Sequence, residues 1–147
     1  MTESVRLWTA VRERRGRVYE ALADYREVVG LVDGLLELQP LSEIEGEGSQ
    51  FAAVLQLGTQ RVHSKLVLSR LVPDELVVWS SADADGRELS FRLVPAENAD
   101  HTKILLVVAY ELPAGIRGVV AAPIVEQAVK RHARATLVRL KEHFGAA

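Results

Sequence analysis

The feature that most constrains the fold is the C-terminal stretch from Pro123 to Phe144, which is predicted to form one long amphipathic helix. Its apolar side chains recur every three or four residues and define one wide stripe. On the opposite face, Glu126, Lys130 and Arg134 follow one another at four-residue intervals, where opposite charges support a helix. Such a helix is about 33 Å long, so its apolar stripe requires a large apolar surface to pack against.

Most of the chain before this helix shows the two-residue alternation that is typical of β-strands. The segments are separated by short turns rich in glycine, proline, asparagine and aspartate, including a hairpin signal at Asp85-Gly86. Short connections favour antiparallel neighbours. We therefore expect seven antiparallel strands, at residues 5–11, 35–44, 51–57, 62–68, 76–79, 89–93 and 102–112.

Two short helices are predicted between the first and second strands. Arg15 to Asp24 changes to helical spacing, and the valine-rich stretch after it forms a second helix that stops at Asp33-Gly34. In the predicted second strand, Leu36, Leu38 and Ile44 are expected on one side. Helices confined to these two places favour an α+β fold with one domain over residues 1–147.

The approach to the long helix, Leu112 to Ala122, is apolar and interrupted by glycine. Because a residue that precedes proline is disfavoured in the helical region, Ala122 is expected outside the helix. Proline is tolerated at the first helical position, so the helix is expected to begin at Pro123.

Composition excludes several classes of protein. The chain has 147 residues, of which 48% are hydrophobic and 26% charged, so a globular domain is favoured over a disordered one. A net charge of −2 argues against a nucleic-acid-binding protein. The absence of cysteine excludes disulfides and thiolate chemistry. No uncharged apolar run reaches the roughly 18 residues of a membrane span, and Met1 to Trp8 does not resemble a signal peptide, so a cytoplasmic location is expected.

Several stretches resemble the START-like (SRPBCC) superfamily, in particular its polyketide cyclase/dehydrase and lipid transport group. They are "RGRVYEALADYREV", "DGLLELQPL", "VVWSSADADGRELSFRLVP", "HTKILLVVAYELP" and "LVRLKEHF", in that order along the chain. The resemblance implies a helix-grip fold, in which a seven-stranded curved antiparallel sheet wraps around the long C-terminal helix. It also implies an internal cavity for a lipid, polyketide or isoprenoid-like molecule, in which some members cyclise or dehydrate a bound polyketide.

Strand alternation and the helix stripe predict which side chains face such a cavity. Each is a candidate for ligand contact, although packing in a filled core is the alternative for every one of them. The inward strand set also includes Phe51 and Leu55. The ligand-binding candidates are Leu66, Leu68, Trp79, Phe91, Leu93, Ile104, Leu106, Val108, Tyr110, Ile124, Ala128, Val129 and His132.

Two of these residues are also candidate catalytic groups. His132 lies at the edge of the helix stripe, and histidine side chains in general are suited to proton transfer because their reference pKa is near neutrality; the alternative is a solvated boundary histidine. Tyr110 is expected to point its hydroxyl into the cavity; the alternative is a tyrosine whose hydroxyl lies at the rim of the cavity. No HExxH pair, nucleophile elbow or glycine-rich phosphate loop is present, so neither a metal nor a cofactor is expected.

The charged face of the fourth strand, which carries Arg61, His63 and Lys65, is expected to be solvated. A one-residue shift in register would turn all three inward and favour an anionic ligand group. Trp8 falls among arginines on the outer face of the first strand, where it packs under their stems or forms a contact with a second subunit.

Three functions follow from these patterns. The first is binding of a small hydrophobic molecule, and the alternative is a polyketide aromatase/cyclase or dehydratase that acts in the same cavity. The third is protein interaction, including a homodimer, through the outer sheet and Trp8.

Overall fold

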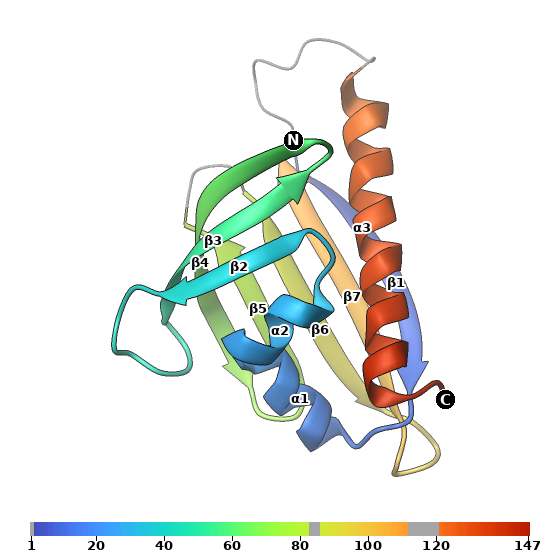
Figure 1. The fold of residues 1–147 in the computed structure, drawn as a ribbon. Helices are drawn as coiled ribbons and strands as arrows, with labels where there is room; N and C mark the ends of the chain where they lie inside the picture. Colours follow the sequence, from blue (N-terminus) through green and yellow to red (C-terminus); the bar gives the residue numbers. More distant parts are fainter. Residues whose placement is uncertain (1, 83–85, 112–120) are drawn as a thin grey trace.

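The computed structural model describes residues 2–82, 86–111 and 121–147, and within these residues the chain forms seven strands and three helices (Figure 1). The strands are β1 (Thr2–Val11), β2 (Leu35–Pro40), β3 (Gln50–Leu57), β4 (Gln60–Val72), β5 (Leu76–Ser81), β6 (Glu88–Pro95) and β7 (Thr102–Glu111). The helices are α1 (Arg15–Ala23), α2 (Tyr25–Leu31) and α3 (Ala121–Phe144). None of the described helices is long and apolar enough to cross a membrane.

All seven strands form one antiparallel sheet in the order β1-β7-β6-β5-β4-β3-β2. Strands β2 to β7 are neighbours in chain order, and β1 closes the series by pairing with β7. The sheet curves around α3, which runs alongside β1 and β7 (Figure 1). The α+β class, the seven antiparallel strands and the two short helices between β1 and β2 are confirmed.

The two short helices cover one end of the sheet, where α1 packs on β5 and β6. Val18, Ala21 and Leu22 are fully buried, as their helical spacing predicts. The indole Nε1 of Trp79 donates to the carbonyl oxygen of Leu22 at 3.0 Å, which fixes the end of α1 on β5. Asp24 then caps α2, because its carboxylate accepts from the backbone N–H of Arg26 at 2.9 Å.

The predicted second strand is wrong in two respects. It ends at Pro40 rather than at Ile44, and Ile44 is 59% exposed. A register shift between Leu35 and Glu37 interrupts the alternation, so Leu35 and Leu38 face inward while Leu36 is 40% exposed. A β-bulge of this kind changes which side chains share a face, and the sequence alternation alone does not reveal it.

The long helix is confirmed, but it begins at Ala121, two residues before the predicted start, and it includes Ala122. Pro123 therefore lies in the first turn, where backbone N–H groups have no partner within the helix and proline loses nothing. Residues 112–120 of the predicted apolar approach from Leu112 to Ala122 lie outside the described residues, as do the strand end at Leu112 and Asp85 of the Asp85-Gly86 turn.

The C-terminal end of α3 is fixed to the end of β1. The backbone N–H of Arg12 donates to the carbonyl oxygen of Gly145 at 2.8 Å, and Val11 forms a β-bridge with Ala146. Several side chains at this junction are buried, among them Val11, Leu140 and Phe144. This end of the space between helix and sheet is therefore filled.

Candidate ligand pocket

Away from the filled end, the space between α3 and the sheet contains a pocket of about 190 Å³. Its walls come from the inner faces of five consecutive strands, from the corner between α2 and β2, and from the middle of α3. Most of the lining is apolar. The lining residues are Val28, Val32, Asp33, Gly34, Leu35, Leu55, Gln56, Leu66, Trp79, Ser81, Arg87, Glu88, Leu89, Leu106, Val108, Ala109, Tyr110, Val129, His132, Ala133 and Thr136.

The structure divides the predicted ligand-binding residues into three groups. Those on the pocket wall are Leu66, Trp79, Leu106, Val108, Tyr110, Val129 and His132. Those buried in the core, away from the pocket, are Leu68, Phe91, Leu93 and Ile104. Of the remaining two, Ala128 is partly buried but does not line the pocket, and Ile124 is 67% exposed.

The prediction for Ile124 was wrong because this residue lies on the solvent side of the helix stripe. For the core group, alternation identified the correct face but not the position along it. Phe91 pairs with Leu106 across β6 and β7, yet only Leu106 reaches the pocket, because α1 packs on β5 and β6.

Several wall residues were not among the predicted ligand-binding candidates. Leu89 shares a face with Phe91 by alternation, so the pattern already contained the signal for it. Ala133 and Thr136 follow the predicted set further along α3. Asp33 was interpreted only as part of a helix stop, although its side chain lies at the pocket wall.

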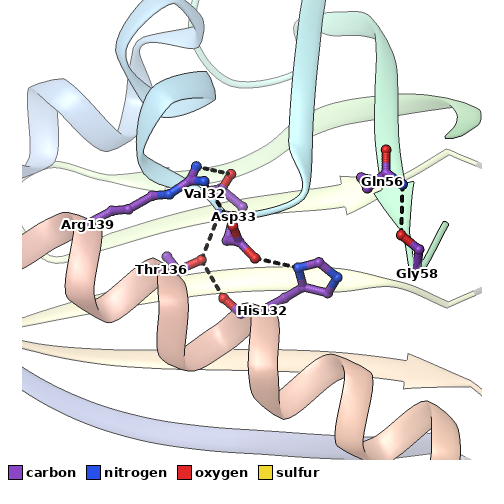
Figure 2. Close-up of polar contacts among 7 residues, drawn as sticks. All are labelled: Val32, Asp33, Gln56, Gly58, His132, Thr136 and Arg139. Atoms are coloured by element: carbon purple, nitrogen blue, oxygen red, sulfur yellow. Dashed lines mark hydrogen bonds and ion pairs between the residues drawn. The ribbon is translucent and has the colours of Figure 1, made fainter. Parts of the chain in front are cut away.

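At the pocket wall, Asp33 contacts two residues of α3, His132 and Arg139, of which His132 also lines the pocket (Figure 2). Its Oδ2 lies 2.6 Å from Nδ1 of His132, and its Oδ1 accepts from Nη2 of Arg139 at 2.9 Å. The side chains of Asp33 and His132 are each only about a quarter exposed. Hydrogen bonds to charged groups are stronger than neutral ones, so this carboxylate is held in place from both sides.

Thr136 and Gly34 bring the α2–β2 corner close to α3. The backbone N–H of Asp33 donates to Oγ1 of Thr136, which in turn donates to the carbonyl oxygen of His132, both at 2.9 Å. A Cβ atom on Gly34 would lie 3.1 Å from Nδ1 of His132. The absence of a side chain at this position therefore allows the histidine to approach.

The second ring nitrogen of His132 faces away from Asp33 (Figure 2). This Nε2 atom is buried and has no hydrogen-bond partner among the described residues. Buried polar atoms in folded proteins normally have a partner. His132 therefore offers an unused hydrogen-bonding position at the wall of an apolar pocket.

Solved structures of similar architecture cover nearly the whole chain. The Zhui aromatase/cyclase from Streptomyces sp. R1128 matches 97% of this chain and 93% of its own, with a TM-score of 0.77 and 16% identity. A START superfamily protein from Mycobacterium smegmatis matches 95% of this chain and 97% of its own, with a TM-score of 0.73 and 12% identity. A protein from Thermus thermophilus matches 95% of both chains, with a TM-score of 0.75 and 19% identity.

The chain has a START-like fold. No protein-family sequence profile matches it, and no curated protein matches it in sequence. At identities below 20%, these structures show the common architecture and not a common function.

In this START-like fold, Tyr110 adds a hydroxyl group to the pocket wall. The residue is 6% exposed. Burial raises the pKa of Tyr110 above its ordinary value, and the carboxylates of Glu126 and Glu3 raise it further. The phenol is therefore neutral at physiological pH and able to donate a hydrogen bond.

The charged face of β4 lies outside the pocket. Arg61, His63 and Lys65 are all exposed, which agrees with the predicted register and excludes the shifted one. Trp8 is 58% exposed on the outer face of β1. Among the described residues, no group of three or more side chains could hold a metal ion.

Proposed function

We propose that the protein binds a small hydrophobic molecule in the pocket between α3 and the sheet. The observation that carries this proposal is a hollow of about 190 Å³ whose walls are mostly leucine, valine, alanine and tryptophan side chains. An apolar cavity of about 150 Å³ stays free of water and accepts benzene in another protein. A pocket of this size and lining is therefore suited to a molecule of one or two rings or to a short branched chain.

The driving force for such binding is the burial of apolar surface, which contributes about 25 cal/mol per Å². The few polar groups at the wall set the orientation of the ligand, as is usual in ligand pockets. Lipids, polyketides and isoprenoids all present the apolar surface that this wall would accept.

A substitution that fills the pocket tests this proposal. Val129 lines the pocket, and Val129→Phe places extra volume where the ligand would lie. Because overpacking costs about 1–3 kcal/mol, naphthalene affinity should fall by about fivefold to 150-fold. The matched control is Val138→Phe, since Val138 is on the same helix but 54% exposed. An NMR titration in which naphthalene does not bind, or binds both variants equally well, would refute pocket binding.

A second candidate function, a polyketide aromatase/cyclase or dehydratase, is favoured by one specific observation. His132 and Tyr110 line the same pocket, and Asp33 fixes the histidine ring. A positioned acid or base contributes about 10²–10⁴-fold to a rate. If the pocket is catalytic, Tyr110→Phe and His132→Leu should each lower the rate of ring closure on a short polyketide thioester by factors in that range. Unchanged rates would exclude these two residues as the acid and base.

A further inference from the structure

The hydrogen bonds around Asp33 determine where His132 carries its proton. An ionised carboxylate only accepts hydrogen bonds, and an arginine only donates them. The Asp33 carboxylate receives Nη2 of Arg139 on one oxygen and faces Nδ1 of His132 at 2.6 Å on the other. Nδ1 must therefore carry the proton, and in the neutral ring Nε2 presents a lone pair.

This lone pair is buried at the pocket wall without a donor among the described residues. A buried acceptor that loses its bonds to water and gains no partner lowers stability. A purely apolar ligand would leave Nε2 unpaired, and a ketone or ether oxygen would place a second acceptor opposite it. A hydroxyl group on the ligand would supply the missing donor.

We propose that the pocket selects an apolar ligand that carries a hydrogen-bond-donating hydroxyl, a phenol or a ring alcohol, and that Nε2 of His132 accepts this bond. Asp33 is the positioning residue that sets the histidine tautomer, and the hydrogen bond from Arg139 orients the Asp33 carboxylate. The inference rests on the proposed binding function and specifies its ligand class.

Two probes, one with a hydroxyl group and one in which a methyl group replaces the donor hydrogen, test this selectivity. These are 1-naphthol and 1-methoxynaphthalene, with naphthalene as the apolar reference, titrated by calorimetry in mildly alkaline buffer. The preference for naphthol is the Kd of 1-methoxynaphthalene divided by the Kd of 1-naphthol. This ratio should be about threefold to tenfold larger in the wild type than in His132→Leu. His143→Leu is the matched control, because His143 is an exposed histidine of the same helix that does not line the pocket.

A substitution at Asp33 tests the role of the tautomer. In Asp33→Asn, the amide oxygen remains the only group able to accept from Arg139, so the amide nitrogen faces His132 and donates to Nδ1. The proton then moves to Nε2, which becomes a donor. The preference for 1-naphthol should then fall to the level of His132→Leu, because a hydroxyl oxygen and an ether oxygen can both accept from a protonated Nε2. An unchanged naphthol preference in this variant would overturn the assignment.

The outcomes distinguish a failure of the hydroxyl selectivity from a failure of the proposed binding function. If naphthalene and both derivatives fail to bind the wild type, the proposed function fails. If all three bind and His132→Leu leaves the ratio unchanged, pocket binding stands and the hydroxyl selectivity is wrong. Should Asp33→Asn fail to fold, ¹⁵N NMR of wild-type His132 decides: the Nδ1-protonated tautomer supports the inference, and the Nε2-protonated tautomer contradicts it.

Discussion

Gly34 is the residue at which the backbone geometry of the pocket is most constrained. Its φ of +87° lies in the left-handed region, and an added Cβ would lie 3.1 Å from His132 Nδ1 and 3.2 Å from the carbonyl oxygen of Gln56. Its own carbonyl oxygen accepts from the backbone N–H of Gln56 at 2.7 Å. The same glycine therefore makes the turn possible and leaves space for the histidine.

Gly34→Ala should destabilise the protein by about 1–3 kcal/mol, because alanine is strained at positive φ and its methyl group crowds His132. The matched control is Gly30→Ala in α2, where an added Cβ meets nothing within 4 Å. That substitution should stabilise by about 0.5–1 kcal/mol through the lower entropy of the unfolded chain. Urea unfolding measures both, and equal effects at the two glycines would contradict this account.

Tyr110 predicts how stability changes at high pH. Burial raises its pKa in the folded state, so above pH about 10 the unfolded chain loses the phenol proton first. The contribution of the protonated Tyr110 phenol to stability is complete below that pH and is lost as the pH rises through the folded-state pKa. The free energy of unfolding should be measured between pH 9 and 12, about one unit below and two above the ordinary tyrosine pKa. It should fall less steeply with pH in Tyr110→Phe than in the wild type. Parallel curves would mean that the phenol is not desolvated.

At this scale, the sequence predicted the candidate site only in part. His132 and Tyr110 were identified because helix and strand periodicity places them at the edge of apolar faces. The partner of His132 could not be found in this way, since Asp33 is 99 residues away in the chain and local patterns carry no information on such contacts.

Among the elements, the α2–β2 corner and α3 are joined by a small set of directional contacts. Thr136, which is 2% exposed, accepts from the backbone N–H of Asp33, while Arg139 bonds the carboxylate of the same residue. These contacts fix the distance between the helix and the corner, and with it the width of the pocket at His132.

Thr136→Val should destabilise this junction by about 1–3 kcal/mol, because the Asp33 N–H loses its acceptor while the shape of the side chain is retained. Thr136→Ser keeps the hydroxyl and serves as the control. Hydrogen exchange at the Asp33 amide is the decisive readout: it should accelerate in the valine variant and remain slow in the serine variant. Equally slow exchange in both would show that Thr136 does not hold the corner.

Alternation and helical spacing were sufficient to predict the type and order of the elements that the structure describes. Several element ends were placed differently, including the start of α3, whose first turn tolerates Pro123, and the facing of the β2 side chains was wrong because the β2 bulge is a local departure from alternation. The errors at the start of α3 and in β2 arise where backbone hydrogen bonding, rather than side-chain hydrophobicity, decides the outcome.

For the whole molecule, the central feature is the difference between the two ends of the space under α3. At one end, Leu140 and Phe144 of α3 are buried, and the end of the helix is tied to β1. Toward the other end, Val129, Ala133 and Gly34 leave a hollow. Periodicity predicts which face of a sheet is buried but not where the packed volume falls short, so Phe91 and Ile104 could not be distinguished from Leu106 and Val108 by sequence.

The measurement that tests the central claim most directly is the contact between a bound apolar molecule and individual methyl groups. Intermolecular NOEs from naphthalene should be observed in methyl-labelled protein. The account predicts NOEs to the pocket methyl groups of Leu106, Val108 and Val129, and none to the exposed Val138. NOEs confined to Val138 and other surface methyl groups, or no NOEs at saturating probe, would contradict the claim that this fold holds a ligand beneath its long helix.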